Sequence, residues 1–146
     1  MTPTEIGLIR SSWAAVVPIA DTAASLFYAR LFELDPAIER LFRRTDMDAQ
    51  RKNLMQTLTV VVKSLDTLDQ IVPAVQALGR RHAGYGVREE HYATVGEALI
   101  WTLEQGLGEA FTTDVRSAWT EAYVTLATVM IEAARADTET AVEAAA

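Results

Sequence analysis

The sequence predicts a single all-α domain of about seven to eight helices, and three observations support this fold class. The 146 residues are enough for one substantial core, and half of them are apolar. Glycine and proline are sparse, at 7 and 4 residues. Apolar residues recur at the spacing of a helical face, and no segment reads convincingly as a strand. We therefore expect one domain over residues 1–146, in which 137–146 frays or extends the last helix.

The first two helices are expected on either side of a proline. Thr2 or Thr4 can cap a helix that runs to about Val17, and Pro18 suits the first turn of the next helix. The apolar face of the first helix consists of Ile6, Ile9, Trp13 and Val16. That of the second consists of Ala24, Phe27, Tyr28, Leu31 and Phe32.

A short helix and a longer one are expected next. Asp35 and Pro36 restart a helical turn that ends at Leu41–Phe42. The polar residues 43–48 form a loop, in which Asp46 or Asp48 caps the next helix. That helix carries a stripe of side chains at helical spacing, namely Gln50, Leu54, Leu58, Val61 and Leu65.

The fifth long segment leads to the first of two histidines. Residues 64–70 form a polar connection with a possible single turn, and Pro73 is expected to open a helix that ends at His82. Gly84 and Gly86 would stop this helix.

Two helices complete the expected fold. One runs from about 89 to 105, and Gly106 and Gly108 would break it. Thr112 or Thr113 then caps the last helix. The apolar residues of this last helix are Trp119, Tyr123, Leu126, Met130 and Ile131.

Charge and cysteine content narrow the possible partners. The net charge of −7 and the pI near 4.8 argue against nucleic acid or an anionic membrane as the main partner. The absence of cysteine excludes disulfides, a thiolate nucleophile, an iron–sulfur cluster and a thioether-attached cofactor. No basic leader with an apolar core opens the chain, and no apolar run approaches the length of a membrane span. We expect a soluble cytoplasmic protein.

His82 is the most informative single residue, because the chain has only two histidines. Val75 and Leu78 lie seven and four residues before it, so the three share one helical face. An imidazole at the end of an apolar stripe is either a core histidine bonded to a backbone carbonyl or a metal ligand. Taken alone, the position favours the core histidine.

Three upstream features favour the metal ligand. Phe42 follows Pro36 by six residues, and Tyr28 places a hydroxyl on an otherwise apolar helical face. Gln50 and Leu54 are four residues apart, so a polar and an apolar side chain project from adjacent turns. These are the parts needed around a flat, apolar, iron-bearing ring: one imidazole ligand, a clamping aromatic, and two hydrogen-bond donors at the open coordination position.

With these parts in place, the chain resembles the globin family, most closely the single-domain bacterial haemoglobins and the haem domain of flavohaemoglobins. The resemblance runs from Trp13 to about Met130. Each segment that carries it is weak alone, but four occur in order at suitable separations. They are residues 26–32 (LFYARLF) with Pro36 and Phe42, residues 81–87 (RHAGYGV), residues 91–96 (HYATVG) and residues 118–123 (AWTEAY).

The resemblance implies a globin fold around a b-type haem, iron protoporphyrin IX. The implied cofactor contacts are His82 as the iron ligand, Phe42 as the ring clamp, Tyr28, Gln50 and Leu54 as the distal pocket, and Val87, Tyr92 and Val95. His91, at a helix start, is expected to have a surface or capping role instead. Arg44 and Arg81 could pair with the haem propionates.

The chain departs from the flavohaemoglobin pattern at one position. There, a tyrosine matching Tyr92 joins a glutamate beside the proximal histidine. Ala134 occupies the matching position here, and the nearest acid, Glu132, lies two residues earlier. Two residues on a helix correspond to a rotation of roughly 200°, so Glu132 should face elsewhere. This weakens the case for a peroxidase-like proximal histidine.

We expect the protein to bind O₂ reversibly at ferrous iron, as a carrier or store that also binds CO and NO. Neutral His82 would supply the axial nitrogen, and Tyr28 and Gln50 would hydrogen-bond the O₂. One alternative is a nitric oxide dioxygenase with a separate reductase, because the chain has no Gly-rich dinucleotide or flavin motif. A haem-based gas sensor is another, although 146 residues leave no output domain. The remaining alternative is a haem-free globin-like scaffold, in which His82 and Phe42 would have no common role.

Overall fold

The computed structural model describes the backbone of residues 1–145 and the side chains of residues 1–137. Within these limits the chain forms seven α-helical elements, one of them a single turn, and no strand. The predicted all-α class is therefore confirmed. The α-helices are α1 (Pro3–Val16), α2 (Ala20–Leu34), α3 (Pro36–Glu39), α4 (Met47–Lys63), α5 (Leu68–Gly84), α6 (Glu89–Leu107) and α7 (Thr113–Ala145). The 3₁₀ turns are η1 (Val17–Ile19), η2 (Arg40–Phe42), η3 (Leu65–Thr67) and η4 (Gly108–Ala110).

Helix starts predicted from capping residues are confirmed. Thr2 accepts a hydrogen bond from the Glu5 backbone N–H at 3.2 Å, and the Glu5 carboxylate accepts from the Thr2 N–H at 3.0 Å. Asp46 accepts from two backbone N–H groups at the start of α4, at 3.1 and 3.3 Å. Thr112 accepts from the Val115 N–H at 3.2 Å at the start of α7.

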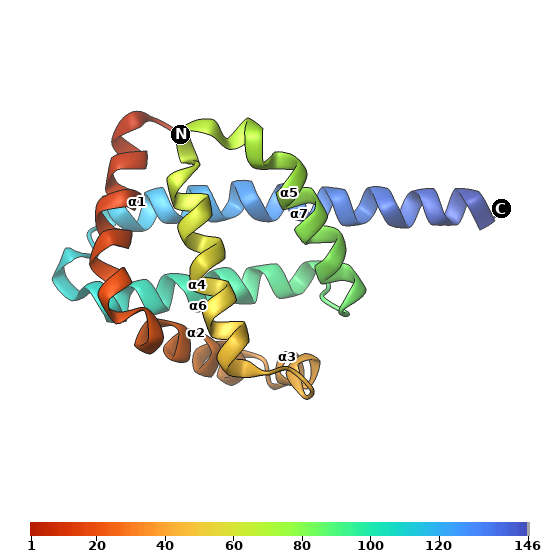
Figure 1. Cartoon of the computed structure of the whole chain (residues 1–146), viewed down its shortest axis with the longest axis horizontal. Helices are drawn as coiled ribbons and strands as arrows, with labels where there is room; N and C mark the ends of the chain where they lie inside the picture. The colour runs from red at the N-terminus through yellow and green to blue at the C-terminus, as the bar shows by residue number, and fades with distance from the viewer. Residues whose placement is uncertain (146) are drawn as a thin grey trace.

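Two predicted helix boundaries were wrong. Pro73 lies inside α5 instead of opening it, and Figure 1 shows that α5 changes direction in its N-terminal half. A proline removes one helical hydrogen bond and crowds the preceding turn, which bends a helix without ending it when the flanking turns are packed. Gly106 lies within α6, whereas Gly108, at φ +56°, ends it. Only the second glycine adopts a backbone conformation that other residues avoid.

The helices form two crossing layers, shown in Figure 1, with α6 and α7 side by side and α4 and α5 crossing over them. The helix α5 packs mainly on α7, while α2 packs on α6 and α1 on α7. The C-terminal part of α7 extends beyond the rest of the molecule.

The densest part of the core lies where α1 meets α6 and α7. Ile9 and Leu103 are 0% and 1% exposed, and burial of each such side chain is worth about 1.5–3 kcal/mol. The rings of Trp13 and Trp119 lie 5.8 Å apart at an interplanar angle of 53°. Each indole N–H donates a hydrogen bond to a hydroxyl, Trp119 to Ser12 at 2.9 Å and Trp13 to Thr59 at 3.0 Å. This part of the fold is therefore apolar and fully hydrogen-bonded at its tryptophans.

Contrary to the expectation from the sequence, the stretch Pro3–Leu34 is long and apolar enough, by length and composition alone, to cross a membrane. It is two helices, however, because η1 separates α1 from α2 and the two point in different directions in Figure 1. The core helix of a soluble protein passes the same test. Ile9 and Leu31, at 0% and 2% exposed, lie in the core of this fold.

Candidate functional site

His82 lies in the last turn of α5 and is partly buried. Its Nδ1 lies 2.8 Å from the Leu78 carbonyl oxygen, one turn earlier in the same helix. A carbonyl can only accept, so Nδ1 carries the proton and Nε2 keeps a free lone pair. Burial lowers the pKa of His82, the Leu78 hydrogen bond raises it by less, and the charge of Arg81 lowers it. The imidazole is thus held neutral and oriented, with one nitrogen able to ligate a metal.

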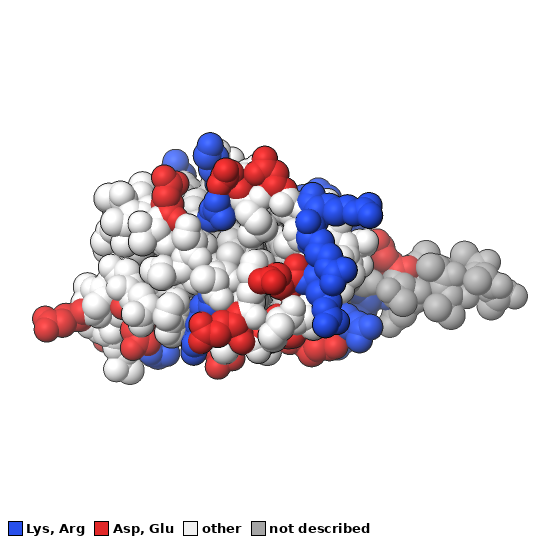
Figure 2. Space-filling view, turned by 90° about the horizontal axis from the view of Figure 1, so that it is seen from below, with Lys and Arg blue, Asp and Glu red and all other residues white. Residues whose placement is uncertain are grey.

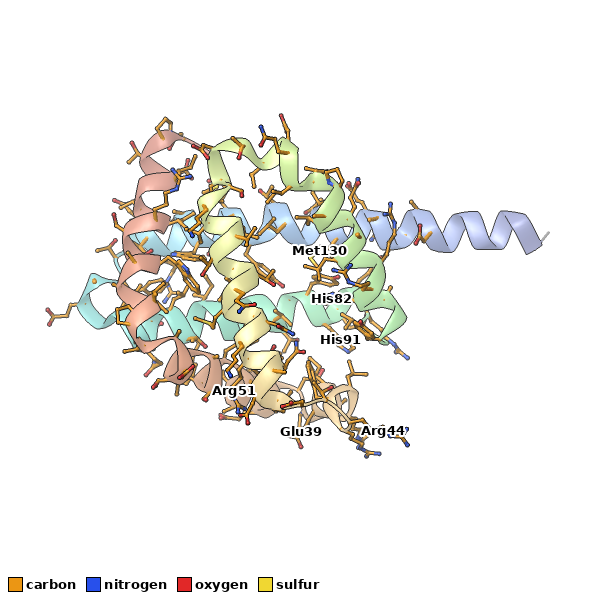
Figure 3. The ribbon with its side chains drawn as sticks, in the orientation of Figure 1. Glu39, Arg44, Arg51, His82, His91 and Met130 are labelled. Carbon is orange, nitrogen blue, oxygen red and sulfur yellow. The ribbon has the colours of Figure 1, made fainter. Side chains whose placement is uncertain are left out.

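The hydrogen bond at His82 does not by itself decide between a core histidine and a ligand. A satisfied core histidine would make the same contact to Leu78. The distinction depends on what surrounds the free nitrogen. Figure 3 labels His82 on α5 and Met130 on α7, and the two backbones meet one turn earlier, at Gly79 and Met130.

Tyr28 and Gln50 are brought together from α2 and α4. The Gln50 side-chain amide donates a hydrogen bond to the Tyr28 hydroxyl at 3.1 Å. Tyr28 is 5% exposed, and burial raises its pKa, with the Gln50 hydrogen bond and Arg51 opposing the shift. The hydroxyl therefore stays protonated at neutral pH. Because its oxygen accepts from Gln50, its own proton is free for another acceptor.

Phe42 joins this pair through ring contacts. Its ring lies 5.6 Å from that of Tyr28, near edge-to-face at 67°, and 5.4 Å from that of Phe32. Such aromatic pairs prefer this tilted geometry over a face-to-face stack. The turn η2 thus holds Phe42 against the hydroxyl-bearing face of α2.

The remaining predicted contacts lie on two helices and in one corner. Leu54 of α4 and Val95 of α6 pack partly buried against the core. Val87, in the corner after α5, and Tyr92, in the first turn of α6, are also partly buried. Apart from Tyr28, every predicted contact keeps some exposed surface. The polypeptide therefore does not fully cover these apolar side chains, and an apolar cofactor could cover them.

The predicted distal residues contact one another directly, whereas His82 makes its contact elsewhere. Tyr28, Gln50 and Phe42 touch one another. Among the described side chains, no hydrogen bond or ring contact links them to His82, whose partner is Leu78. A flat group bound between these two sets of residues would complete the site, and the single free nitrogen of His82 suits a metal whose other ligands come from that group.

A tyrosine that the sequence marked only as packing contacts the backbone of a predicted site residue. The Tyr123 hydroxyl donates to the Tyr92 carbonyl oxygen at 2.6 Å, and burial raises the pKa of Tyr123. Gly96 makes room for this ring, since a Cβ there would lie 2.7 Å from it. This contact fixes the first turn of α6 against α7.

Gly79 is a second residue that sequence reasoning missed. It is buried one turn before His82, and a Cβ at this position would lie 2.6 Å from the Met130 Cα. The backbones of α5 and α7 therefore touch at this point. A glycine within an apolar helical face is the sequence signal that could have indicated it.

The structure shows where Glu132 and His91 lie. Glu132 is exposed and Ala134 is partly buried, so the acid faces away from the position that the matching glutamate would occupy, as the helical rotation requires. His91 accepts a hydrogen bond from the Arg88 backbone N–H at 2.9 Å and so caps the start of α6. Its Nδ1 is occupied by this contact.

A surface hollow of about 480 Å³ between α6 and α7 is lined by none of these predicted contacts. The Arg30 guanidinium lies over the Trp101 ring there, 5.1 Å from its centre, and pairs with Glu33 at 2.9 Å. The Glu33 carboxylate offsets the charge of Arg30, whereas the buried Arg30 Nε makes no hydrogen bond among the described residues.

Comparison with known proteins identifies the chain's relatives. A family model described as Globin matches residues 25–130. The flavohemoprotein of Bacillus subtilis is 30% identical over 128 residues, which cover 86% of this chain and 32% of the relative. The neuroglobin of Danio rerio is 33% identical over 137 residues, which cover 85% of this chain and 86% of the relative. The chain therefore spans about a third of the flavohemoprotein and most of the neuroglobin.

Solved structures match the fold over nearly the whole chain. An engineered carbene transferase from Rhodothermus marinus, described as a candidate nitric oxide dioxygenase, superposes with a TM-score of 0.86 at 25% identity, over 97% of this chain and 99% of that one. A bacterial globin from Campylobacter jejuni gives 0.82 at 21% identity, over 94% and 99%.

Proposed function

Since this chain belongs to the globin family, we propose that it binds a b-type haem noncovalently through His82 and binds O₂ reversibly, as a carrier or store. A bound haem supplies an iron with one open coordination position for a diatomic gas. The chain has no cysteine for a thioether bond, which supports noncovalent binding.

The residues present fit this cofactor. His82 offers one lone pair at Nε2, because Nδ1 is held by the Leu78 carbonyl at 2.8 Å. Phe42, Leu54 and Val95 offer partly exposed apolar surface. With a haem bound, this apolar lining would limit access of water, which would slow loss of an electron from the iron.

The hydrogen bond from Gln50 to Tyr28 is the observation that carries the proposal. A buried tyrosine hydroxyl whose oxygen already accepts from Gln50 has its proton available to a ligand with partial negative charge, such as O₂. Gln50 then acts by orienting Tyr28, which refines the expectation that both side chains donate to the gas.

The absorption spectrum of the purified protein tests the proposal. The reduced protein should show a five-coordinate ferrous haem spectrum that changes on addition of O₂ and returns on its removal. A protein that carries no haem after expression with an adequate haem supply would contradict the proposal.

Nitric oxide dioxygenation is the second candidate, favoured by the 30% identity to flavohemoproteins and by the Rhodothermus marinus structure. It would use the same pocket and require an external reductase. The exposed position of Glu132 provides no acid beside His82, which favours the carrier. Consumption of NO by the oxygenated protein with a supplied reductase, measured at several turnovers per haem, would move the assignment to the enzyme.

We also propose a cytoplasmic location, where cellular reductases could return oxidised iron to the ferrous form. Cell fractionation followed by immunodetection tests this part, with the soluble cytoplasmic fraction as the expected position.

A further inference from the structure

Three arginines lie within five residues in and just after η2. Arg40, Arg43 and Arg44 are all exposed, and Phe42 lies between them. Among the described side chains, none of the three takes part in an ion pair. Figure 3 shows Arg44 at the outer edge of this turn, and Figure 2 shows lysine and arginine side chains gathered in a stripe at this end of the molecule.

A second segment lies directly against this turn. A Cβ at Gly86, whose φ is +93°, would lie 3.3 Å from the Leu41 side chain, so the corner after α5 packs on η2. The same corner carries Tyr85, 68% exposed, and Arg88, whose side chain is 77% exposed. We call Arg40, Arg43, Arg44, Tyr85 and Arg88 the arginine surface.

The local charge of this surface opposes that of the chain. The net charge is −7, yet the nearby acids are largely engaged: Asp46 caps α4, and Asp48 pairs with Arg51. Glu39, labelled in Figure 3, directly precedes η2, and Glu90 lies 3.9 Å from Arg88. A positive surface on an acidic protein attracts partners of opposite charge while the rest of the molecule repels them. Arginine and tyrosine are also enriched where protein interfaces form.

We propose that the arginine surface docks the acidic face of a one-electron-donor protein. The inference rests on the proposed function, in which an iron oxidised to the ferric form must regain one electron from outside. Phe42 lies among the arginines of η2, and Val87 directly precedes Arg88. Both are predicted cofactor contacts, so a donor docked here lies at the mouth of the pocket. The donor loses one electron and the ferric iron gains it, with no proton or leaving group required.

Two triple variants with the same change in net charge provide the test. Arg40→Gln with Arg43→Gln and Arg88→Gln removes three positive charges from the surface, and Arg44 is kept because it could reach the haem propionates. The control, Gln56→Glu with Gln70→Glu and Gln105→Glu, adds three negative charges at exposed positions elsewhere. The probe is an acidic plant-type ferredoxin, reduced photochemically, and photoreduced lumiflavin serves as a small neutral donor.

The expected result at low salt is a loss of about tenfold or more in the rate of reduction by ferredoxin for the arginine variant. The control should lose about twofold. Reduction by lumiflavin should be the same in all three proteins, and only the wild type and the control should slow steeply with salt. Amide chemical-shift mapping with oxidised ferredoxin, a readout without electron transfer, should place the perturbed signals on the arginine surface of the wild-type holoprotein.

Several results would overturn the proposal. Equal losses in the two triple variants would show that only net charge matters. Faster loss of haem from the arginine variant would show that these side chains hold the cofactor. Sedimentation of the wild type with phosphatidylglycerol vesicles, without shifts on ferredoxin, would assign the surface to a membrane. Failure of the proposed function is separate, because it appears as a protein without haem or O₂ binding, whereas failed docking appears in a holoprotein with normal O₂ binding.

Discussion

The hydroxyl of Tyr28 is the group on which retention of O₂ should depend. A hydrogen bond to a ligand with partial charge is worth about 1.5–3 kcal/mol, and most such differences appear in the dissociation rate. Tyr28→Phe should therefore speed O₂ dissociation by about ten- to a hundredfold in stopped-flow measurements. CO dissociation should change much less, because CO carries little charge.

Gln50→Leu supplies a graded comparison for the same measurement. It removes the 3.1 Å bond that orients Tyr28 but keeps the hydroxyl, so its effect on O₂ dissociation should be smaller and in the same direction. Equal O₂ dissociation rates in the wild type and Tyr28→Phe would remove Tyr28 from the site.

The two histidines should differ completely in their effect on haem. His82→Ala removes the ring nitrogen that the Leu78 contact leaves free for the iron and should leave haem absent or loosely held. His91→Ala removes a cap on α6 and should bind haem normally, with a small loss of stability. The ferrous absorption spectrum of each variant, recorded without added imidazole, checks this. An unchanged spectrum for His82→Ala would show that another residue ligates the iron.

The lowered pKa of His82 predicts a pH dependence of apoprotein stability. Its folded-state pKa lies below the ordinary value of about 6.5, so between these two values the unfolded chain binds a proton that the folded chain does not. The free energy of unfolding should therefore decrease as the pH falls below about 6.5. Urea unfolding of the wild type and His82→Gln at pH 7.5, 6.5 and 5.5 measures the difference. The variant should lose less stability over this range; identical slopes would contradict the assignment.

At the scale of helices, the contact between α5 and α7 depends on Gly79. A Cβ there would lie 2.6 Å from the Met130 Cα, so Gly79→Ala must push the two helices apart. We expect a loss of about 1–3 kcal/mol. The matched control is Gly7→Ala in α1, where a Cβ meets nothing within 4 Å and should stabilise by about 0.5–1 kcal/mol. Urea unfolding of the two apoproteins measures both changes, and a neutral Gly79→Ala would contradict the close packing.

Helix existence could be predicted from the sequence more reliably than helix boundaries. The caps Thr2, Asp46 and Thr112 act through residues two or three positions away, so local sequence determines them. Pro73 and Gly106 were assigned as boundaries because both disfavour helix locally. Their helices continue because packing of the flanking turns on other helices outweighs these local costs, and those contacts are not visible in a linear pattern.

In the site, too, local features could be predicted from the sequence, whereas contacts between helices could not. The spacing of Gln50 and Leu54 predicted their shared face of α4, and the resemblance supplied the roles of Tyr28 and His82. The bond between Gln50 and Tyr28 joins residues 22 apart in the chain, and it depends on how α2 packs against α4. The Tyr123 contact to Tyr92 spans 31 residues and depends equally on packing. Interactions of this range follow from tertiary structure, which periodicity alone does not specify.

For the whole molecule, removal of haem should affect the helices unequally. The helix α5 packs mainly on α7, and its other predicted neighbour is the cofactor that His82 would ligate. The helices α1, α2 and α6 share the dense core around Ile9 and Leu103. Hydrogen exchange should therefore become faster first in α5 and η2 of the apoprotein, with the α1 and α6 amides retaining protection. Uniform loss of protection across all helices would contradict this division.

The tryptophan pair gives the molecule an optical signal that separates local opening from global unfolding. Trp13 and Trp119 lie 5.8 Å apart, both 4% exposed, and both indole N–H groups are hydrogen-bonded. Two rigid, tilted chromophores this close couple their electronic transitions, so their near-ultraviolet circular dichroism depends on their fixed mutual orientation. Because both belong to the core beside α1 and neither belongs to α5, this band should persist when α5 loosens and disappear only when the core itself melts.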